Sequence, residues 1–338
     1  MTGGPVTGGP ATGGSAMVRP VESAVRSPFG PVLLGGAGYA NLYAAVSEDE
    51  AQAGLTTAWE LGLRAFDTAP HYGAGLSEER LGRFLCTRPR DEFVVCTKVG
   101  RLLVDDPAAS ADAEGFADAP RRSRRFDYSA DGVRRSLSES LQRLGLDRID
   151  LALVHDPEDH LDQALGEAAK ALSALRAKGV IGGWGVGTNF AATAERFVAE
   201  TDLDHLMIAG RYTLLDRRAD RLLGAAAERG VAVLTAGVLN SNILVDPAPG
   251  ARFNYVPAPA PLLAAAQQME AVCRRYGSTL RAAALQFGLR DPRVTGVVLG
   301  AGLPDLVADS VEQLGAVIDE ACWAELEALV PDPAELPD

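Results

Sequence analysis

The chain has 338 residues, of which 47% are hydrophobic and 23% charged, and its formal net charge is −13. The hydrophobic content suits one large barrel-sized domain, and the acidic balance argues against nucleic acid or anionic membrane surfaces as partners. No stretch approaches the roughly 18 apolar residues of a membrane span, and the four cysteines show neither metal-ligand nor disulfide spacing. We therefore expect a cytoplasmic protein without a metal site.

The N-terminal segment 1–27 repeats Thr-Gly-Gly-Pro and Ala-Thr-Gly-Gly. This composition cannot bury enough apolar surface to offset the entropy of ordering, so we expect a disordered tail over 1–27 and one folded domain over 28–338. The segment Pro31-Val-Leu-Leu-Gly-Gly-Ala-Gly38 predicts a first strand that runs into a glycine-rich turn. At such a turn the backbone can approach a ligand closely.

The next informative segment, 61–80, predicts a short apolar strand, a polar cluster, a glycine-rich turn and a helix opened by Ser77. Asp67 lies where the strand ends, and Tyr72 lies on the loop five residues later. In barrels and in open α/β sheets, catalytic side chains project from the edge formed by the carboxyl ends of the strands. The segment is therefore the first candidate for part of an active site.

A long segment from 100 to about 129, rich in Ala, Asp, Pro and Arg, delays the helix that is expected after the strand 93–98. A loop of this length in a compact domain usually has a function or is disordered. Because it follows a barrel strand, we expect it to lie over the active-site face as a substrate-covering flap.

The remaining chain alternates between predicted strands and helices, which is the pattern of a parallel (β/α)8 barrel in the α/β class. Helical periodicity is present over about 48–61, 131–144, 162–177, 191–200, 220–229, 262–276, 279–289 and within 304–329. The eight predicted strands lie near residues 32, 64, 94, 150, 183, 206, 232 and 296.

Four chemically distinct side chains end three of these strands: Asp67 with Tyr72, then Lys98, then His155. Each has a structural alternative, since the acid could cap a turn, the lysine could be a solvated surface charge and the histidine a structural hydrogen-bonding group. Together they suit proton transfer. A lysine ammonium favours the phenolate, a carboxylate fixes the lysine, and a histidine can orient a carbonyl or alcohol oxygen.

Three ordered motifs, Phe66-Asp-Thr-Ala-Pro-His-Tyr-Gly73, Cys96-Thr-Lys98 and Leu153-Val-His155, resemble the tetrad motifs of the aldo-keto reductase superfamily. The resemblance covers nearly everything from residue 28 to the C-terminal helices. Two further motifs, Phe126-Asp-Tyr-Ser and Gly210-Arg-Tyr-Thr-Leu-Leu-Asp216, are similar to a sugar-oxidising branch of that superfamily. This branch includes D-threo-aldose 1-dehydrogenases, L-fucose dehydrogenases and pyridoxal 4-dehydrogenases.

The resemblance implies a nicotinamide cofactor, NAD or NADP, across the barrel mouth. It implies that Asp67, Tyr72, Lys98 and His155 are catalytic, with Tyr72 as the general acid in reduction and the base in oxidation. Thr188 and Asn189 would lie at the nicotinamide carboxamide, although an Asx turn is the alternative for Asn189. The other expected cofactor-binding residues are Gly36, Ala37, Arg211, Ala236, Gly237, Val238, Leu239, Asn240, Ser241, Gly300, Ala301, Gly302 and Asp309.

The chain departs from the family pattern at three places. Ala209, with Arg211 nearby, occupies a position where the family often has glutamine, and the segment 235–242 lacks the aromatic stacking platform. The stretch 300–309 contains no cation, and Asp309 would repel a nearby adenosine 2′-phosphate. Because a phosphate without Arg or Lys loses its charge-assisted hydrogen bonds, we expect a preference for NAD.

The predicted activity is hydride transfer between the nicotinamide and a carbonyl or hydroxyl carbon of a small molecule. The branch resemblance favours oxidation of an aldose at its anomeric carbon to a lactone. A carbonyl reductase acting on a biosynthetic intermediate and a nucleotide-binding regulatory module with little turnover are the two alternatives. The sequence carries no code for the substrate or for the oligomeric state.

Overall fold

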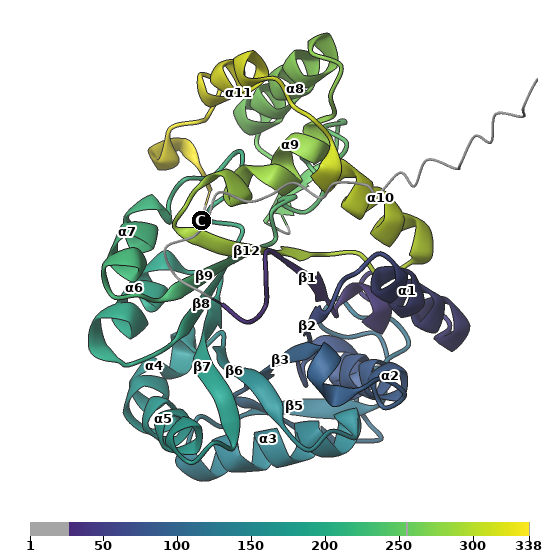
Figure 1. Cartoon of the computed structure of the whole chain (residues 1–338), viewed down its shortest axis with the longest axis vertical. Helices are drawn as coiled ribbons and strands as arrows, with labels where there is room; N and C mark the ends of the chain where they lie inside the picture. Colours follow the sequence, from purple (N-terminus) through teal and green to yellow (C-terminus); the bar gives the residue numbers. More distant parts are fainter. Residues whose placement is uncertain (1–26, 255, 338) are drawn as a thin grey trace, which may run out of the picture.

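The computed structural model describes residues 27–254 and 256–337. Within them, eight parallel strands close into a barrel in the order β1-β12-β9-β8-β7-β6-β3-β2, and helices surround it (Figure 1). This confirms the predicted (β/α)8 barrel. The barrel strands are β1 (Val32–Gly35), β2 (Ala65–Asp67), β3 (Val94–Val99), β6 (Ile149–His155), β7 (Ile181–Thr188), β8 (His205–Ala209), β9 (Ala232–Ala236) and β12 (Val294–Leu299).

The strands are buried on both faces, which explains their nearly continuous apolar runs. One set of side chains, which includes Leu33, Leu151 and Leu234, fills the barrel interior, and a larger set packs between the barrel and the helices. Parallel register places the ends of neighbouring strands side by side, for example Asp67 beside Cys96 and Lys98 beside Leu153. The polar residues at these strand ends therefore share one mouth of the barrel.

The helices begin and end with ordinary capping signals. Ser47 forms a reciprocal capping box with Glu50 at the start of α1, and Gly145 ends α3 in the left-handed conformation with φ of 64°. The helices are α1 (Glu48–Glu60), α2 (Leu76–Leu85), α3 (Ala130–Leu144), α4 (Leu161–Gln163), α5 (Ala169–Ala177), α6 (Ala191–Glu200), α7 (Asp220–Glu228), α8 (Ala260–Arg275), α9 (Leu280–Phe287), α10 (Pro304–Gly315) and α11 (Glu320–Glu327).

One predicted helix has an irregularity, and one predicted helix cap was wrong. Residues 162–177 are helical as predicted, but they contain a π-helical turn, η5 (Ala164–Ala168), between α4 and α5. Ser77 does not cap α2, because Gly75 is the N-cap and Ser77 lies inside the helix. Its hydroxyl instead donates to the carbonyl oxygen of Gly36 at 3.0 Å and lies 2.7 Å from the Thr68 hydroxyl. A tertiary contact between the loops after β1 and β2 thus outweighs the capping preference.

The segment 100–129 is more ordered than a long loop. It contains an antiparallel hairpin of β4 (Arg101–Asp105) and β5 (Arg122–Phe126), which pair from Arg101 with Phe126 to Asp105 with Arg122. A second small hairpin, β10 (Arg252–Phe253) with β11 (Val256–Pro257), follows β9. Both hairpins lie in connections that leave the carboxyl ends of barrel strands.

The predicted tail 1–27 lies outside the described residues except for Ser27, whose hydroxyl is 3.1 Å from His205 Nε2. Among the helices of the described ranges, none is both long enough and apolar enough to cross a bilayer.

Candidate active site

Asp67 and Lys98 form a buried ion pair at the ends of β2 and β3. Lys98 Nζ donates to Asp67 Oδ1 at 2.6 Å and to the carbonyl oxygen of Thr68 at 3.0 Å. The two charged side chains are only 2% and 3% exposed. Burial is the largest single effect and disfavours the ammonium, but the charge and hydrogen bond of Asp67 together with the charges of Tyr72 and Cys96 outweigh it, so the pKa of Lys98 is raised above its usual value. The lysine is therefore a fixed cation and not a solvated surface charge.

Tyr72 follows β2 at the start of a tight turn, η2 (Tyr72–Gly75). Gly73 has φ of 57°, and a Cβ atom there would lie 2.6 Å from the carbonyl oxygen of Ala40. This turn brings the half-buried Tyr72 ring to the barrel mouth, where Lys98 Nζ lies 4.7 Å from the ring centroid. The phenol predicted from the loop and the lysine predicted from the next strand are thus neighbours.

The pKa of Tyr72 is raised above its usual value of 10, because loss of water at the site outweighs the attraction of Lys98. The sequence indicates the neighbouring lysine but not this burial. Lys98 still lowers the pKa of Tyr72 relative to a site without a cation. The protein without ligand therefore carries a protonated phenol next to a fixed ammonium.

His155 ends β6, and its ring lies 5.9 Å from that of Tyr72 in an edge-to-face arrangement. The Tyr128 hydroxyl donates to the His155 carbonyl oxygen at 2.6 Å. Burial, together with the charges of Arg101 and Lys98, holds the pKa of His155 well below 6.5. The imidazole is thus neutral, and it can donate one hydrogen bond and accept another.

Three residues that the sequence analysis did not assign to the site also lie here. His71 packs 5.7 Å from His155, and burial lowers its pKa to about 2. Phe116, from the segment 100–129, packs 6.2 Å from the Tyr72 ring and 5.5 Å from His71. The third, Asp156, has its carboxylate 3.4 Å from His155 Nε2. His71 and Asp156 are sequence neighbours of tetrad residues, which is a usable signal, whereas nothing local identifies Phe116.

The expected nicotinamide contacts lie at the end of β7. Thr188 is buried and its hydroxyl donates to Glu158, while the Phe190 N–H donates to the Thr188 hydroxyl at 2.9 Å. Asn189 is half-buried beside it. The turn at this strand end is therefore made by Thr188, and the Asn189 side chain is not the capping group.

The expected cofactor-binding loop 236–241 lies beside the end of β8. The Gly210 N–H donates to the Ala236 carbonyl oxygen at 2.8 Å, and the Asn240 amide donates to the Gly210 carbonyl oxygen at 3.3 Å. Asn240 and Ser241 have φ of 43° and 59°, and Gly237 has φ of 60°. The other expected cofactor-binding residues of this region lie in the connections that follow two strands: Arg211, which is buried, follows β8, and Val238 and Leu239 follow β9.

The loop 300–302 after β12 packs against the turn after β1. A Cβ atom on Gly302 would lie 2.4 Å from the Gly38 carbonyl carbon, and one on Gly36 would lie 2.4 Å from the Ser77 hydroxyl oxygen. Ala301 is buried, Gly300 is exposed and Ala37 is half-buried. Gly36 and Gly302 therefore allow the connections around the barrel mouth to pack closely against their neighbours.

The stretch 300–309 itself contains no cation, but a cation from another helix lies beside Asp309. Arg281, at the start of α9, places Nη1 2.5 Å from Asp309 Oδ2 and donates to the Ser310 hydroxyl at 2.8 Å. The arginine is 28 positions earlier in the chain and only the packing of α9 on α10 brings it there. The Asp309 carboxylate is thus paired with a cation.

The residues around the mouth fit a dinucleotide in one further respect. Asn240 Oδ1 is buried and has no hydrogen-bond partner within the described parts of the chain. An unsatisfied buried amide oxygen costs free energy, which a polar ligand over this loop would recover. Asn240 and its neighbours would then contact the ligand through backbone and amide groups.

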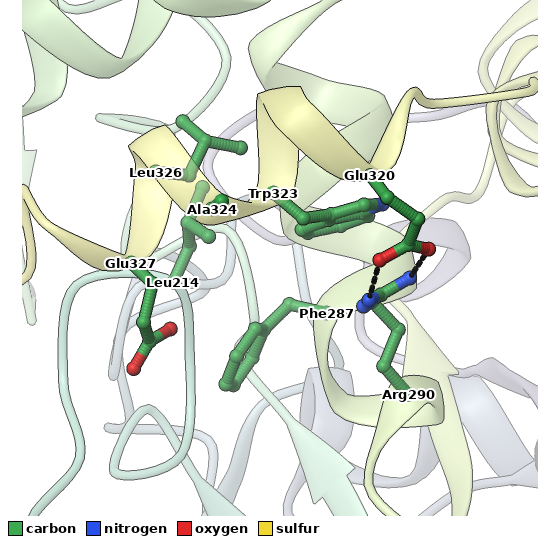
Figure 2. A pocket seen from close by; sticks show the side chains of 8 residues that line it. All are labelled: Leu214, Phe287, Arg290, Glu320, Trp323, Ala324, Leu326 and Glu327. Atoms are coloured by element: carbon green, nitrogen blue, oxygen red, sulfur yellow. Dashed lines mark hydrogen bonds and ion pairs between the residues drawn. The ribbon is translucent and has the colours of Figure 1, made fainter.

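A separate cavity of about 290 Å³ lies between α9 and α11 (Figure 2), and no tetrad residue lines it. Arg290 crosses it to Glu320 with two hydrogen bonds of 2.8 and 2.7 Å, and its guanidinium lies 4.5 Å from the Trp323 ring centroid. These contacts fasten α11 to the barrel. None of the predicted site residues lines this cavity.

The residues 31–331 match the model of the aldo/keto reductase family. The chain is similar to D-threo-aldose 1-dehydrogenase of Pseudomonas sp, with 45% identity over 309 residues that cover 88% of this chain and 94% of that protein. It is also similar to pyridoxal 4-dehydrogenase of Microbacterium luteolum, with 37% identity over 316 residues that cover 87% and 92% of the two chains.

Among solved structures, the holo form of an aldo-keto reductase of Bacillus halodurans has a TM-score of 0.75 to this chain, covering 94% of this chain and 97% of its own. At 23% identity, this likeness concerns the fold alone.

Proposed function

The chain belongs to the aldo/keto reductase family and is an oxidoreductase of that family, and we propose that it oxidises an aldose at the anomeric carbon to a lactone with NAD or NADP. The observation that carries the proposal is the position of Lys98 Nζ, 2.6 Å from Asp67 Oδ1 and 4.7 Å from the centre of the Tyr72 ring. The name of the 45% identical relative supports the substrate class. We also propose that residues 28–338 form the single folded domain.

When bound across the barrel mouth, a nicotinamide dinucleotide would supply the hydride acceptor, which no side chain provides. Thr188, Asn189 and the loop 236–241 would hold it. When the anomeric carbon loses its hydride, the hydroxyl on that carbon becomes a carbonyl. The proton of that hydroxyl must go to a base. We assign this role to Tyr72.

To accept this proton, Tyr72 must first release its own proton to solvent and become the phenolate, and the neighbouring groups make that ionisation easier. Lys98 favours the phenolate, and Asp67 keeps the lysine in place. The neutral His155 can hydrogen-bond to the reacting oxygen and keep it within reach of Tyr72. In the reverse direction Tyr72 returns the proton to the carbonyl oxygen, while these groups stabilise the charge that develops there.

For the cofactor we propose NAD in preference to NADP. Arg281 places a cation beside α10, the helix that follows the loop 300–302, but its guanidinium is already paired with Asp309. An adenosine 2′-phosphate would have to compete with that carboxylate, and would lie close to its negative charge. The expected preference for NAD therefore depends on the pairing of Arg281 with Asp309, and not on the absence of a cation.

The first test follows reduced nicotinamide by its absorbance, with NAD or NADP and a panel of aldoses and pyridoxal, for the wild type and for Tyr72→Phe. Cofactor reduction by an aldose that is lost in the variant is the expected result. Oxidation of reduced cofactor by generic aldehydes, with no reaction of aldoses, would favour a carbonyl reductase of another substrate. Tight cofactor binding without turnover in either direction would favour the regulatory module.

A further inference from the structure

Asp156 follows His155 directly and has an unusual backbone conformation, with φ of 41°. Aspartate is one of the few residue types that adopt the left-handed region at modest cost. The Asp156 N–H donates to the Gly187 carbonyl oxygen at 3.0 Å, and the Asp156 carbonyl oxygen lies 3.0 Å from the Tyr128 hydroxyl, whose single proton it shares with the His155 carbonyl oxygen at 2.6 Å. The backbone of Asp156 is thus fixed from two sides.

The Asp156 carboxylate lies between a fixed cation and the site histidine. Its Oδ2 atom is 2.6 Å from Arg101 Nη2 and 3.4 Å from His155 Nε2. The side chain is 33% exposed, compared with 3% for Asp67. Asp67 is therefore closed to a ligand, whereas Asp156 presents a carboxylate that a ligand beside His155 can reach.

This arrangement places a neutral imidazole and a carboxylate side by side at the site of proton transfer. If the carbonyl or alcohol oxygen of the substrate is hydrogen-bonded to His155, the carbon next to the reacting carbon lies near Asp156. A hydroxyl on that carbon can donate to the carboxylate, in a charge-assisted hydrogen bond, whereas an unsubstituted carbon cannot. Arg101 keeps the carboxylate in place at little cost in side-chain freedom.

We propose that Asp156 is a specificity-determining residue that selects polyhydroxylated substrates by accepting a hydrogen bond from the hydroxyl next to the reacting carbon. The inference rests on the proposed function, since it assumes that the substrate oxygen lies at Tyr72 and His155. It extends that function by assigning recognition of the neighbouring hydroxyl to a residue outside the tetrad.

The inference predicts a pH dependence of substrate selection. Burial raises the pKa of Asp156 to about 6, while Arg101 acts in the opposite direction. Because only the ionised carboxylate accepts this strong hydrogen bond, the preference for hydroxylated substrates increases as pH rises from 5 to 7. The titratable groups that face Asp156 come from six segments: Tyr72 of η2, Lys98 of β3, Arg101 of β4, Tyr128 before α3, His155 of β6 and Glu158 of η4 (Glu158–His160).

The experiment compares two aldehydes of equal chain length, glyceraldehyde and propanal, which differ by the hydroxyl groups. The ratio of their kcat/KM values in reduction is measured at pH 5, 6 and 7 for the wild type and for Asp156→Asn, which keeps the shape and tolerates the backbone conformation. We expect the ratio to fall about tenfold to a hundredfold in the variant at pH 7 and to lose its pH dependence. Asp159→Asn, on the exposed face of η4, is the matched control.

An unchanged ratio in Asp156→Asn would overturn the inference, and so would a wild type that shows no preference for glyceraldehyde. If Asp156→Asn fails to fold, Arg101→Gln releases the carboxylate from its cation, and the same fall in ratio is expected. Aldose oxidation is measured separately. A wild type that reduces both aldehydes but oxidises no aldose contradicts the proposed function alone, and one that reduces neither contradicts both.

Discussion

Replacing Lys98 with methionine removes the ammonium of the buried ion pair while keeping an unbranched side chain of similar length. In the wild type Lys98 Nζ contacts Asp67 Oδ1 at 2.6 Å, and the two side chains are 2% and 3% exposed. Solvent therefore cannot screen the carboxylate that the substitution leaves behind. The change tests whether the pair is needed for folding as well as for proton transfer.

The size of the expected effect follows from this burial. Removing one partner of a buried ion pair typically costs about 3–5 kcal/mol, because the other charge is left without compensation. Replacing both partners by neutral groups of similar shape costs much less. We therefore expect Lys98→Met to lose about 3–5 kcal/mol of the free energy of unfolding, and Asp67→Asn combined with Lys98→Met to recover at least about 1.5 kcal/mol of this loss.

Urea unfolding at pH 7, followed by the fluorescence of the three tryptophans, measures these differences for the two single variants and the double variant. Hydride transfer is measured on the same samples. We expect the two variants that carry Lys98→Met to be slow because Tyr72 has lost its cation, and Asp67→Asn to be slow because Lys98 is no longer held in place. A loss below about 1 kcal/mol for Lys98→Met, or strictly additive single effects, would contradict the argument from a buried and unscreened pair.

Two other predictions concern backbone packing and cofactor choice. Gly100 has φ of 107°, and a Cβ atom there would lie 2.1 Å from the Tyr128 ring, so Gly100→Ala should destabilise the protein by about 2 kcal/mol or more in urea unfolding. Gly145→Ala is its control, since that glycine also has positive φ but no atom within 4 Å, and equal losses would contradict the steric reason. Asp309→Asn should release Arg281 and raise the NADP-to-NAD ratio of kcat/KM about fivefold or more. An unchanged ratio would show that this pair lies too far from the cofactor to affect it.

Much of the framework followed from local sequence. Short apolar runs alternate with amphipathic segments, and this alternation specifies parallel strands and covering helices. The α6 helix was predicted with its observed bounds, and β8 and β12 contain the predicted strand positions 206 and 296, because each element has a strong pattern and clear ends. The residues Asp67, Lys98 and His155 were predicted together for the same reason, since each ends a strand and barrel closure brings strand ends to one mouth.

Other features depend on contacts between segments that local patterns do not specify. The sequence indicated a long loop over 100–129, but strand pairing within it forms a hairpin that brings Phe116 onto Tyr72. It also indicated a helix cap at Ser77, but the hydroxyl serves a contact between two loops. In both places a tertiary interaction decides the outcome, and neither interaction has a signature within a few residues.

The sequence by itself determined the barrel and the chemical types of the groups at its mouth, because apolar periodicity and strand ends are local properties of the chain. The tertiary structure decided the electrostatics of those groups. Burial raises the pKa of Tyr72 despite the nearby lysine. Arg281 of α9 pairs with Asp309 of α10. The turn after β6 places the Asp156 carboxylate beside the His155 ring. Desolvation and charge pairing depend on the distances between atoms, and only the closed barrel fixes those distances.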